Sequence, residues 1–338
     1  MTPALRRIAC GLALAVAAQG PATTPLEAQN PDLALTPAER DSVLANYHNV
    51  FPLLGRKAIE RGFDLPKPFG INAVGVWVKQ GIDIDDIGLS TGDDPVQPAD
   101  FIQFGDNTST VTTANLRADL WVLPFLNVYG MGGVARANTT VKLTEPIPFT
   151  SSVDQTGNYL GVGLTGAFGI KRFFTVVDVN WAWTNLEKLD EPVTSRVLSM
   201  RLGRAFKVGR ANRIQAWLGT MNVKFKSETN GSILLVDAIP PETLEQIRGQ
   251  LETVGDESWY QQLPPAQRVV VDQLVDRLLS GDYSDATVNY RLEKAPSTPW
   301  NMLVGGNFDL GKTWSFRAEV GFIGRYSVLL NTVYRLNF

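Results

Sequence analysis

The sequence predicts an all-β chain that folds into a single antiparallel β-barrel of about ten strands, within a range of roughly eight to twelve. Three observations predict this fold class. Many stretches of the chain alternate apolar and polar residues with a period of two. The connections between them are short at one rim and mostly long at the other. The last stretch alternates to the final residue, so no later element covers its apolar face.

Residues 1–28 have the organisation of a cleaved secretion signal. Arg6 and Arg7 precede a short apolar run over 8–18. That run is too short to span a bilayer, because a spanning helix needs about 20 apolar residues. The only cysteine, Cys10, lies in this segment. The mature chain is therefore expected to have no disulfide, thiolate metal site or cysteine nucleophile.

Residues 29–69 are expected to form an amino-terminal helical arm. The run Thr36-Pro37-Ala38-Glu39 is a capping box with proline at the first helical position, and it predicts a helix running to about Tyr47. Apolar residues of this segment, such as Phe51 and Phe63, are expected to be buried away from water. We therefore expect the arm to lie at the barrel mouth or inside the lumen as a plug, and the alternative is a free position in the periplasm.

The predicted barrel occupies residues 70–338. Strands 126–142 and 213–227 change phase midway, which predicts a β-bulge in each. The ten predicted strands are 72–86, 111–123, 126–142, 158–170, 173–185, 194–208, 213–227, 300–310, 313–323 and 327–338.

The connections between predicted strands fall into two classes. Those after even-numbered strands are tight, as at 124–125 and 171–172, whereas most of the others are long. Long connections are predicted at 88–108, 143–157, 187–193 and 228–298. The last of these is an insertion with two helical stretches, opened by Pro240-Pro241 and Pro264-Pro265. Val288 to Leu292 is either the return into the barrel or part of a further strand pair.

The closing stretch carries a resemblance to a known class. Tyr334, Leu336 and the terminal Phe338 stand at alternate positions. This pattern resembles the closing strand of bacterial outer-membrane β-barrel proteins, although no single family is matched. The resemblance implies recognition of the terminal strand by the barrel-assembly machinery, residence in the outer membrane, and contact with its lipid and lipopolysaccharide. It also implies that the short turns face the periplasm.

Several function classes are disfavoured by composition. The net charge of −3, from 31 basic and 34 acidic residues, gives no electrostatic footprint for nucleic acid. The single histidine, His48, lies in the arm, away from any strand serine that it could activate. Metal sites built on His or Cys are excluded by count. We therefore expect a non-enzymatic protein without a cofactor.

Two groups of charged residues are candidate sites. An acidic loop is a weak metal candidate, although its spacing matches no EF-hand. The acidic loop comprises Asp83, Asp85, Asp86, Asp93 and Asp94. The second group has both signs and falls on the inward phase of the strands. This second group comprises Arg117, Asp119, Asp178, Arg201, Asp309, Arg317, Glu319 and Arg335.

The inward charges have two interpretations. They either form ion pairs that fill a small lumen, as expected for a narrow barrel, or line a polar passage. The first functional hypothesis is a narrow passage or binding site for a small polar or amphipathic solute. The alternative is a structural or surface-interaction protein that acts through the 228–298 insertion.

Overall fold

The computed structural model describes residues 34–91, 95–145, 148–170, 172–186, 192–209, 211–225, 228–234, 241–281 and 287–337. The predicted signal peptide, Asp93, Asp94 and Phe338 lie outside the described residues. Among the described residues, no helix is long and apolar enough to cross a membrane.

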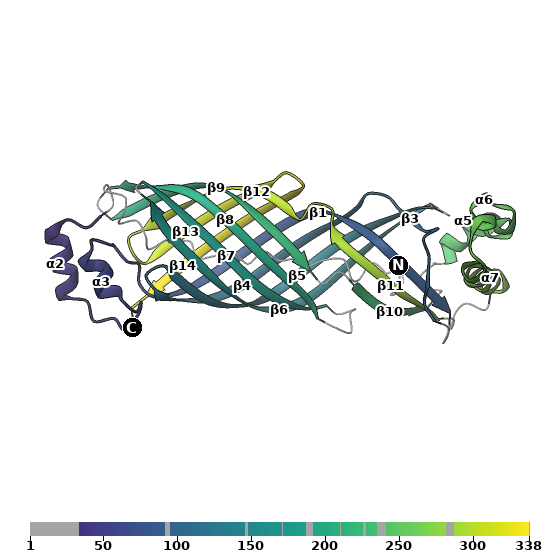
Figure 1. The fold of residues 1–338 in the computed structure, drawn as a ribbon, viewed down its shortest axis with the longest axis horizontal. Coiled ribbons are helices and arrows are strands. Elements are labelled where there is room, and N and C mark those ends of the chain that lie inside the picture. The colour runs from purple at the N-terminus through teal and green to yellow at the C-terminus, as the bar shows by residue number, and fades with distance from the viewer. Residues whose placement is uncertain are drawn as a thin grey trace.

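Ten antiparallel strands form one closed barrel, which confirms the predicted fold class (Figure 1). Closure is made by the first strand, which pairs with the last strand on one side and with its sequence neighbour on the other. The ten strands are β1 (Phe69–Thr91), β4 (Asn107–Leu123), β5 (Leu126–Glu145), β6 (Phe149–Ile170), β7 (Phe173–Leu186), β8 (Val193–Val208), β9 (Asn212–Phe225), β12 (Trp300–Leu310), β13 (Trp314–Phe322) and β14 (Arg325–Leu336).

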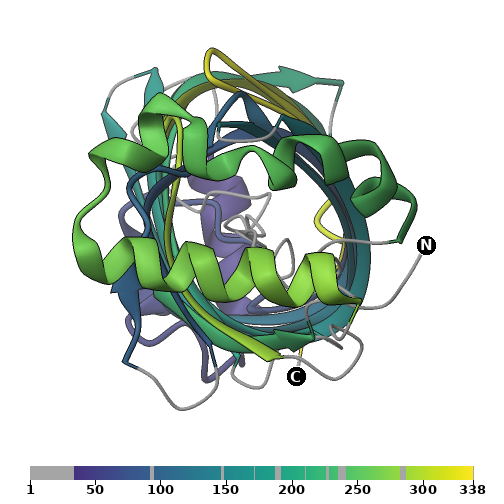
Figure 2. The same ribbon diagram turned by 90° about the vertical axis from the view of Figure 1, so that its right-hand side faces the viewer.

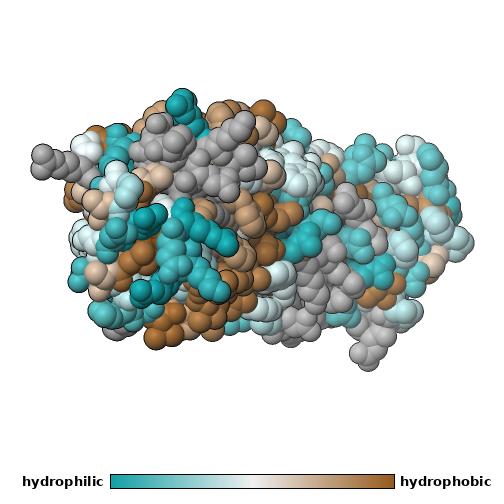
Figure 3. Space-filling view, turned by 60° about the vertical axis from the view of Figure 1, so that its left-hand side comes forward, coloured by the Kyte–Doolittle hydropathy of each residue, from teal (hydrophilic) through white to brown (hydrophobic). Residues whose placement is uncertain are grey.

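Alternation along each strand separates an apolar outer surface from an interior that contains the buried charges together with clusters of apolar side chains. Large hydrophobic side chains such as Leu116, Leu160 and Leu330 are 60 to 70% exposed, whereas their inward neighbours are buried. Trp181, Trp183, Trp300 and Trp314 also face outward near strand ends. Figure 3 shows brown, hydrophobic residues gathered over the flank of the barrel. A closed barrel with this outer surface is the architecture of outer-membrane β-barrels.

Several strands run further than predicted. β1 has 23 residues, β5 has 20 and β6 has 22, whereas a strand needs only about 9–11 residues to cross a bilayer. The predicted loop 143–157 is therefore mostly strand, and only a short connection separates β5 from β6. The barrel wall thus continues beyond the length that a membrane covers.

The two predicted bulges are wrong. β5 pairs with β6 without a register shift, and β9 does the same with β8 and β12. The apparent phase change in β5 arises because its two faces exchange polarity: Ala135 and Ala137 are buried inside, whereas Arg136 and Asn138 are exposed outside. The observed shifts lie at Ile84/Asp86 in β1 and at Trp121/Leu123 in β4.

The insertion after β9 contains both a strand pair and a helical unit. β10 (Glu228–Leu234) and β11 (Thr287–Pro296) form a hairpin, so the further strand pair is present. From Ile82 onward, β11 takes the place of β14 beside β1. Two short strands, β2 (Gln97–Pro98) and β3 (Gln103–Phe104), add to the wall near this end.

Helices cover the end of the barrel reached by the insertion. They are α5 (Pro241–Glu252), η3 (Val254–Asp256), α6 (Ser258–Gln262) and α7 (Pro265–Ser280). In Figure 2 the green helices lie across this end. Leu251, Val271 and Leu278 pack with Leu89 and Tyr290 in one apolar core, separate from the barrel interior. Gly281, in the left-handed conformation, ends α7 as predicted.

The arm lies at the opposite end, beside the short turns (Figure 1). It contains α2 (Pro37–Ala45) and α3 (Gly55–Glu60). The predicted capping box is present, because Glu39 and Thr36 bond each other's backbone N–H groups. Ile59 and Leu65 form a small core with Leu44 and other arm residues.

Candidate functional site

All eight inward charges predicted from the sequence are buried in the barrel. Alternation on a closed wall places them there, because every second side chain must face the interior. They come from β4, β7, β8, β12, β13 and β14. The structure brings them together in three groups and leaves Asp309 among neutral partners.

Glu319 of β13 is the centre of the first group. Its Oε2 accepts hydrogen bonds from Arg201 Nε at 2.7 Å, from Trp217 Nε1 at 2.7 Å and from Arg317 at 2.8 Å. Its Oε1 accepts a further bond from Arg201 at 3.1 Å. The Arg317 guanidinium also lies 5.0 Å from the Trp217 ring centre. One carboxylate thus holds two guanidiniums and an indole.

Asp119 of β4 is the centre of the second group. Its Oδ1 accepts from Arg335 at 3.1 Å and from Asn127 at 2.7 Å, and its Oδ2 accepts from Asn72 at 2.7 Å. Arg335 also donates to the backbone carbonyl of Lys67 at 3.1 Å. The second group therefore connects the lumen wall to the arm.

Asp178 of β7 is the centre of the third group. It accepts hydrogen bonds from the Tyr129 hydroxyl at 3.0 and 3.1 Å and from Thr165 at 2.5 Å. Arg117 lies over the Tyr129 ring, 3.4 Å from its centre. Asp309 differs, because its hydrogen bonds come from the neutral side chains of Ser315, Asn307 and Gln215, the last at 3.2 Å.

Inward-facing glycines give these large side chains room along the wall. A Cβ on Gly305 would lie 2.7 Å from the Trp217 ring, and one on Gly219 would lie 3.0 Å from Arg201 Cγ. A Cβ on Gly163 would clash with the ring of Tyr129. The largest lumen side chains therefore lie flat against neighbouring strands. Groups that lie along the wall leave more of the barrel axis free than groups that project toward it.

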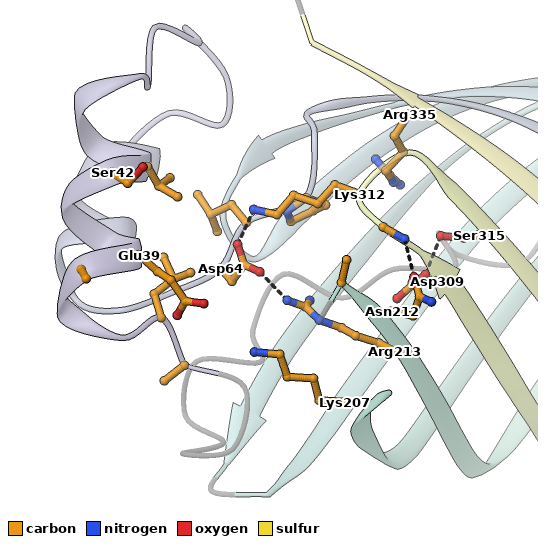
Figure 4. A pocket seen from close by; sticks show the side chains of 18 residues that line it. Glu39, Ser42, Asp64, Lys207, Asn212, Arg213, Asp309, Lys312, Ser315 and Arg335 are labelled. Atoms are coloured by element: carbon orange, nitrogen blue, oxygen red, sulfur yellow. Dashed lines mark hydrogen bonds and ion pairs between the residues drawn. The ribbon is translucent and has the colours of Figure 1, made fainter. Parts of the chain in front are cut away.

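A cavity of about 550 Å³, lined by both apolar and charged residues, lies between the arm and the short-turn rim (Figure 4). Asp64 of the arm forms ion pairs with Arg213 of β9 and with Lys312 in the β12–β13 turn. The side chain of Asp64 is 9% exposed, so this contact is mostly withdrawn from water. Asp309 and Arg335 also line the cavity, so it continues the charged surface of the lumen.

The terminal residues are only partly described. Tyr334 faces outward and pairs across the wall with Ile71 and Trp314, whose ring centre lies 4.8 Å from its own. Leu336 pairs with Phe69 at the barrel seam. Assembly recognition through Tyr334, Leu336 and Phe338 stays a prediction.

The acidic loop is not gathered into a site in the part of the chain that is described. Asp83 accepts a hydrogen bond from Ser297 at 2.5 Å. Asp85 and Asp86 belong to β1, but their side chains lie outside the description, as do Asp93 and Asp94 entirely. Among the described residues, no three His, Cys, Asp or Glu side chains are grouped as metal ligands. His48 is exposed on the arm.

Sequence reasoning missed the neutral members of these groups. Trp217 and Tyr129 fall on the inward phase, but aromatic residues are common on both faces of strands. Asn72 and Asn127 likewise lie on that phase. The usable signal for Trp217 and Tyr129 is the inward glycine opposite each on the next strand, Gly305 and Gly163. Asn72 and Asn127 have no such glycine opposite them.

No protein-family model matches this chain, and no curated protein matches it. Solved structures similar to it include the β domain of the Bordetella autotransporter BrkA, with 10% identity, a TM-score of 0.36, and coverage of 80% of this chain and 100% of that one. OprG from Pseudomonas aeruginosa shows 11% identity and a TM-score of 0.38, covering 80% and 98%. The transport unit of the Escherichia coli autotransporter AIDA-I shows 10% and 0.33, covering 94% and 100%. Similarity at this level does not assign a function to this chain.

Proposed function

We propose that this protein is a non-enzymatic outer-membrane barrel that binds a small polar or amphipathic solute and admits it to a narrow passage. The arm, residues 34–68, closes the passage at the periplasmic rim. The observation that carries this proposal is the cavity of about 550 Å³ between arm and rim, which is continuous with the lumen charges Asp309 and Arg335.

The wall supports a passage over a filled lumen. The three charged groups run along the wall, over inward glycines or small residues of the strands that they cross. Their hydrogen bonds and ion pairs are made with nearby strands of the wall. They therefore form a polar surface that needs no partner on the opposite side of the barrel. Such a surface can exchange hydrogen bonds with a passing polar solute.

The arm is attached at few points, which suits a gate. It meets the rim through the ion pairs of Asp64, and Leu53 N donates to the Val122 carbonyl at 2.8 Å. Lys67 adds a hydrogen bond to Thr313 at 2.8 Å. Arg335 also donates to the Lys67 carbonyl at 3.1 Å, and Trp121 N donates to the Pro68 carbonyl at 2.9 Å, where the arm joins β1. The buried apolar residues Ala58, Ile59 and Leu65 pack in the arm's own small core. The arm can therefore swing away as a unit without exposing that core.

Single-channel conductance of the mature protein in planar bilayers tests the proposal. Replacing Asp64 by Asn removes both ion pairs and should make conductance steps more frequent or larger. The matched control is Asp41→Asn, because Asp41 is 74% exposed and pairs only with its neighbour Arg40 at 3.5 Å. Deletion of residues 29–68, which leaves β1 whole, should give the largest steps.

Silence in all of these proteins would refute the passage, provided that heat-modifiable migration shows folded barrels. The surface-interaction alternative would then be favoured. It has one specific observation in its support, which is that the helical insertion has its own apolar core and covers the long-loop end.

A further inference from the structure

The interior of the barrel carries an excess of positive charge. Among the described residues, the buried charged side chains on the strands comprise six cations and four carboxylates. The buried charges of the described strand residues therefore sum to +2, whereas the net charge of the full sequence is −3. The cations are Arg117, Arg201, Lys294, Arg317, Arg325 and Arg335, and the carboxylates are Asp119, Asp178, Asp309 and Glu319. Low-dielectric walls strengthen such a field and concentrate anions within it.

Arg325 differs from the arginines of the three charged groups. It opens β14 near the long-loop end and is 1% exposed. Its guanidinium donates only to backbone carbonyls, those of Thr298 at 3.4 Å and Pro299 at 3.1 Å, and its Nε has no hydrogen-bond partner. Among the described residues, no carboxylate forms an ion pair with it. A buried cation of this kind has unused capacity for an anion.

Two buried amide side chains with unpaired hydrogen-bonding atoms come from the strands on either side of Arg325, one from β1 and one from β12, with β13 between β12 and β14. Gln80 of β1 is its cross-strand partner, is 4% exposed, and has an Oε1 without a partner. Asn301 of β12 follows two residues after Pro299, is 2% exposed, and has neither side-chain atom bonded. Its amide nitrogen lies over Gly321, next to Ser327 of β14. We call Gln80, Asn301 and Arg325 the outer polar site.

We propose that the solute is a small oxyanion, carrying a carboxylate or a phosphate, and that the outer polar site binds its charged group. The proposal rests on the proposed function, because it names the solute class for that passage. The Arg325 guanidinium and the unpaired Asn301 amide nitrogen are donors of the kind that bind the oxygens of such an anion. The second station is the cavity at the arm, whose lining includes Arg213, Lys312 and Arg335, each paired there with a carboxylate.

Calorimetric titration of the folded mature protein in detergent tests the site. Sodium acetate and sodium phosphate are titrated separately, with ionic strength held by chloride. At least one should bind, and Arg325→Gln should weaken its binding by about tenfold or more. Arg325→Lys should restore part of the affinity. The control is Arg136→Gln, which removes an arginine that is 71% exposed on the outside of the wall.

A second variant covers the case in which Arg325→Gln does not fold. Asn301→Ala removes an amide that has no partner, so it should fold normally and still weaken oxyanion binding. Equal oxyanion binding by the wild type, Asn301→Ala and Arg325→Gln would overturn the proposal. Failure of both acetate and phosphate to bind the wild type in the presence of chloride would also overturn it.

Conductance separates this proposal from the one on which it rests. Conductance steps without oxyanion binding would refute the oxyanion site and leave the passage standing. Oxyanion binding that Arg325→Gln removes, with no conductance in any variant, would refute the passage and leave a binding barrel.

Discussion

Replacing Glu319 by Ala should destabilise the barrel strongly. The carboxylate is 1% exposed and accepts four hydrogen bonds, three of them from Arg201 and Arg317. Its removal leaves two buried guanidiniums without their shared counter-charge. Breaking a buried pair in this way costs about 3–5 kcal/mol. We take about 4 kcal/mol, which lowers the folding equilibrium constant by about a thousandfold.

Unfolding in guanidinium chloride measures this loss of stability, and heat-modifiable gel migration in detergent reports the folded fraction. The control is Asp154→Ala, because Asp154 is 54% exposed and lies 3.9 Å from Arg136 on the outside of the wall. An exposed pair contributes about 0.2–1 kcal/mol, so the control should differ little from wild type. A loss below about 1 kcal/mol for Glu319→Ala would refute the reasoning that this carboxylate neutralises both arginines.

The same variant distinguishes the two interpretations of the lumen. In a passage, Glu319→Ala and Arg317→Ala should also change conductance, because they change the charge that a solute meets. In a filled lumen, the effect should be limited to stability. Reconstituted protein that folds and shows unchanged flux in both variants would contradict the passage.

Three further predictions concern the wall, the arm and the insertion. Gly163→Ala should lower the free energy of unfolding by about 1–3 kcal/mol, because the new Cβ would displace the Tyr129 ring. In the control Gly75→Ala the new Cβ meets nothing within 4 Å, so its stability should be nearly unchanged. Denaturant midpoints test both. Hydrogen bonds from the Thr36 backbone and hydroxyl lower the pKa of Glu39. The ionised carboxylate should therefore stabilise the arm above the ordinary carboxyl pKa, and the arm should become protease-sensitive as the pH falls through the lowered pKa. Thr36→Ala should make the arm protease-sensitive already at pH 7. Leu278→Ala should cost the insertion about 2–5 kcal/mol and leave the barrel intact, which limited proteolysis of the helices with unchanged gel migration would show.

The sequence predicts the barrel well because one physical rule repeats in every strand. A wall residue faces either an apolar outside or a polar inside, so Arg317 and Glu319 mark the inward phase of β13 and Phe316 marks the outward one. The rule fails where the two faces exchange polarity. In β11 (Thr287–Pro296), Val288, Tyr290 and Leu292 are buried, whereas the polar residues between them are not.

The candidate site could be predicted only in part. Phase places all eight charges inside, but their pairing depends on strand neighbours that are far apart in sequence. Arg201 and Glu319 are 118 positions apart, and Arg335 and Asp119 are 216 apart. The sequence pattern does not mark Arg325 as a buried charge, because it follows a tight turn, where a charged residue is ordinarily solvated. Its burial follows from the β11–β12 connection, which passes over it.

The seam between β1 and β14 sets an order for assembly. On one of its two edges, β1 pairs over twelve residues, from Phe69 to Gln80, with the last strand of the chain. Such long-range pairing must wait until the carboxy-terminal residues are in place. Until then, β1 and β13 have open edges that could pair with other chains. Asp64 lies five residues before β1 and contacts Lys312, so the arm can dock only on a closed ring. Its docking therefore reports that the barrel is complete.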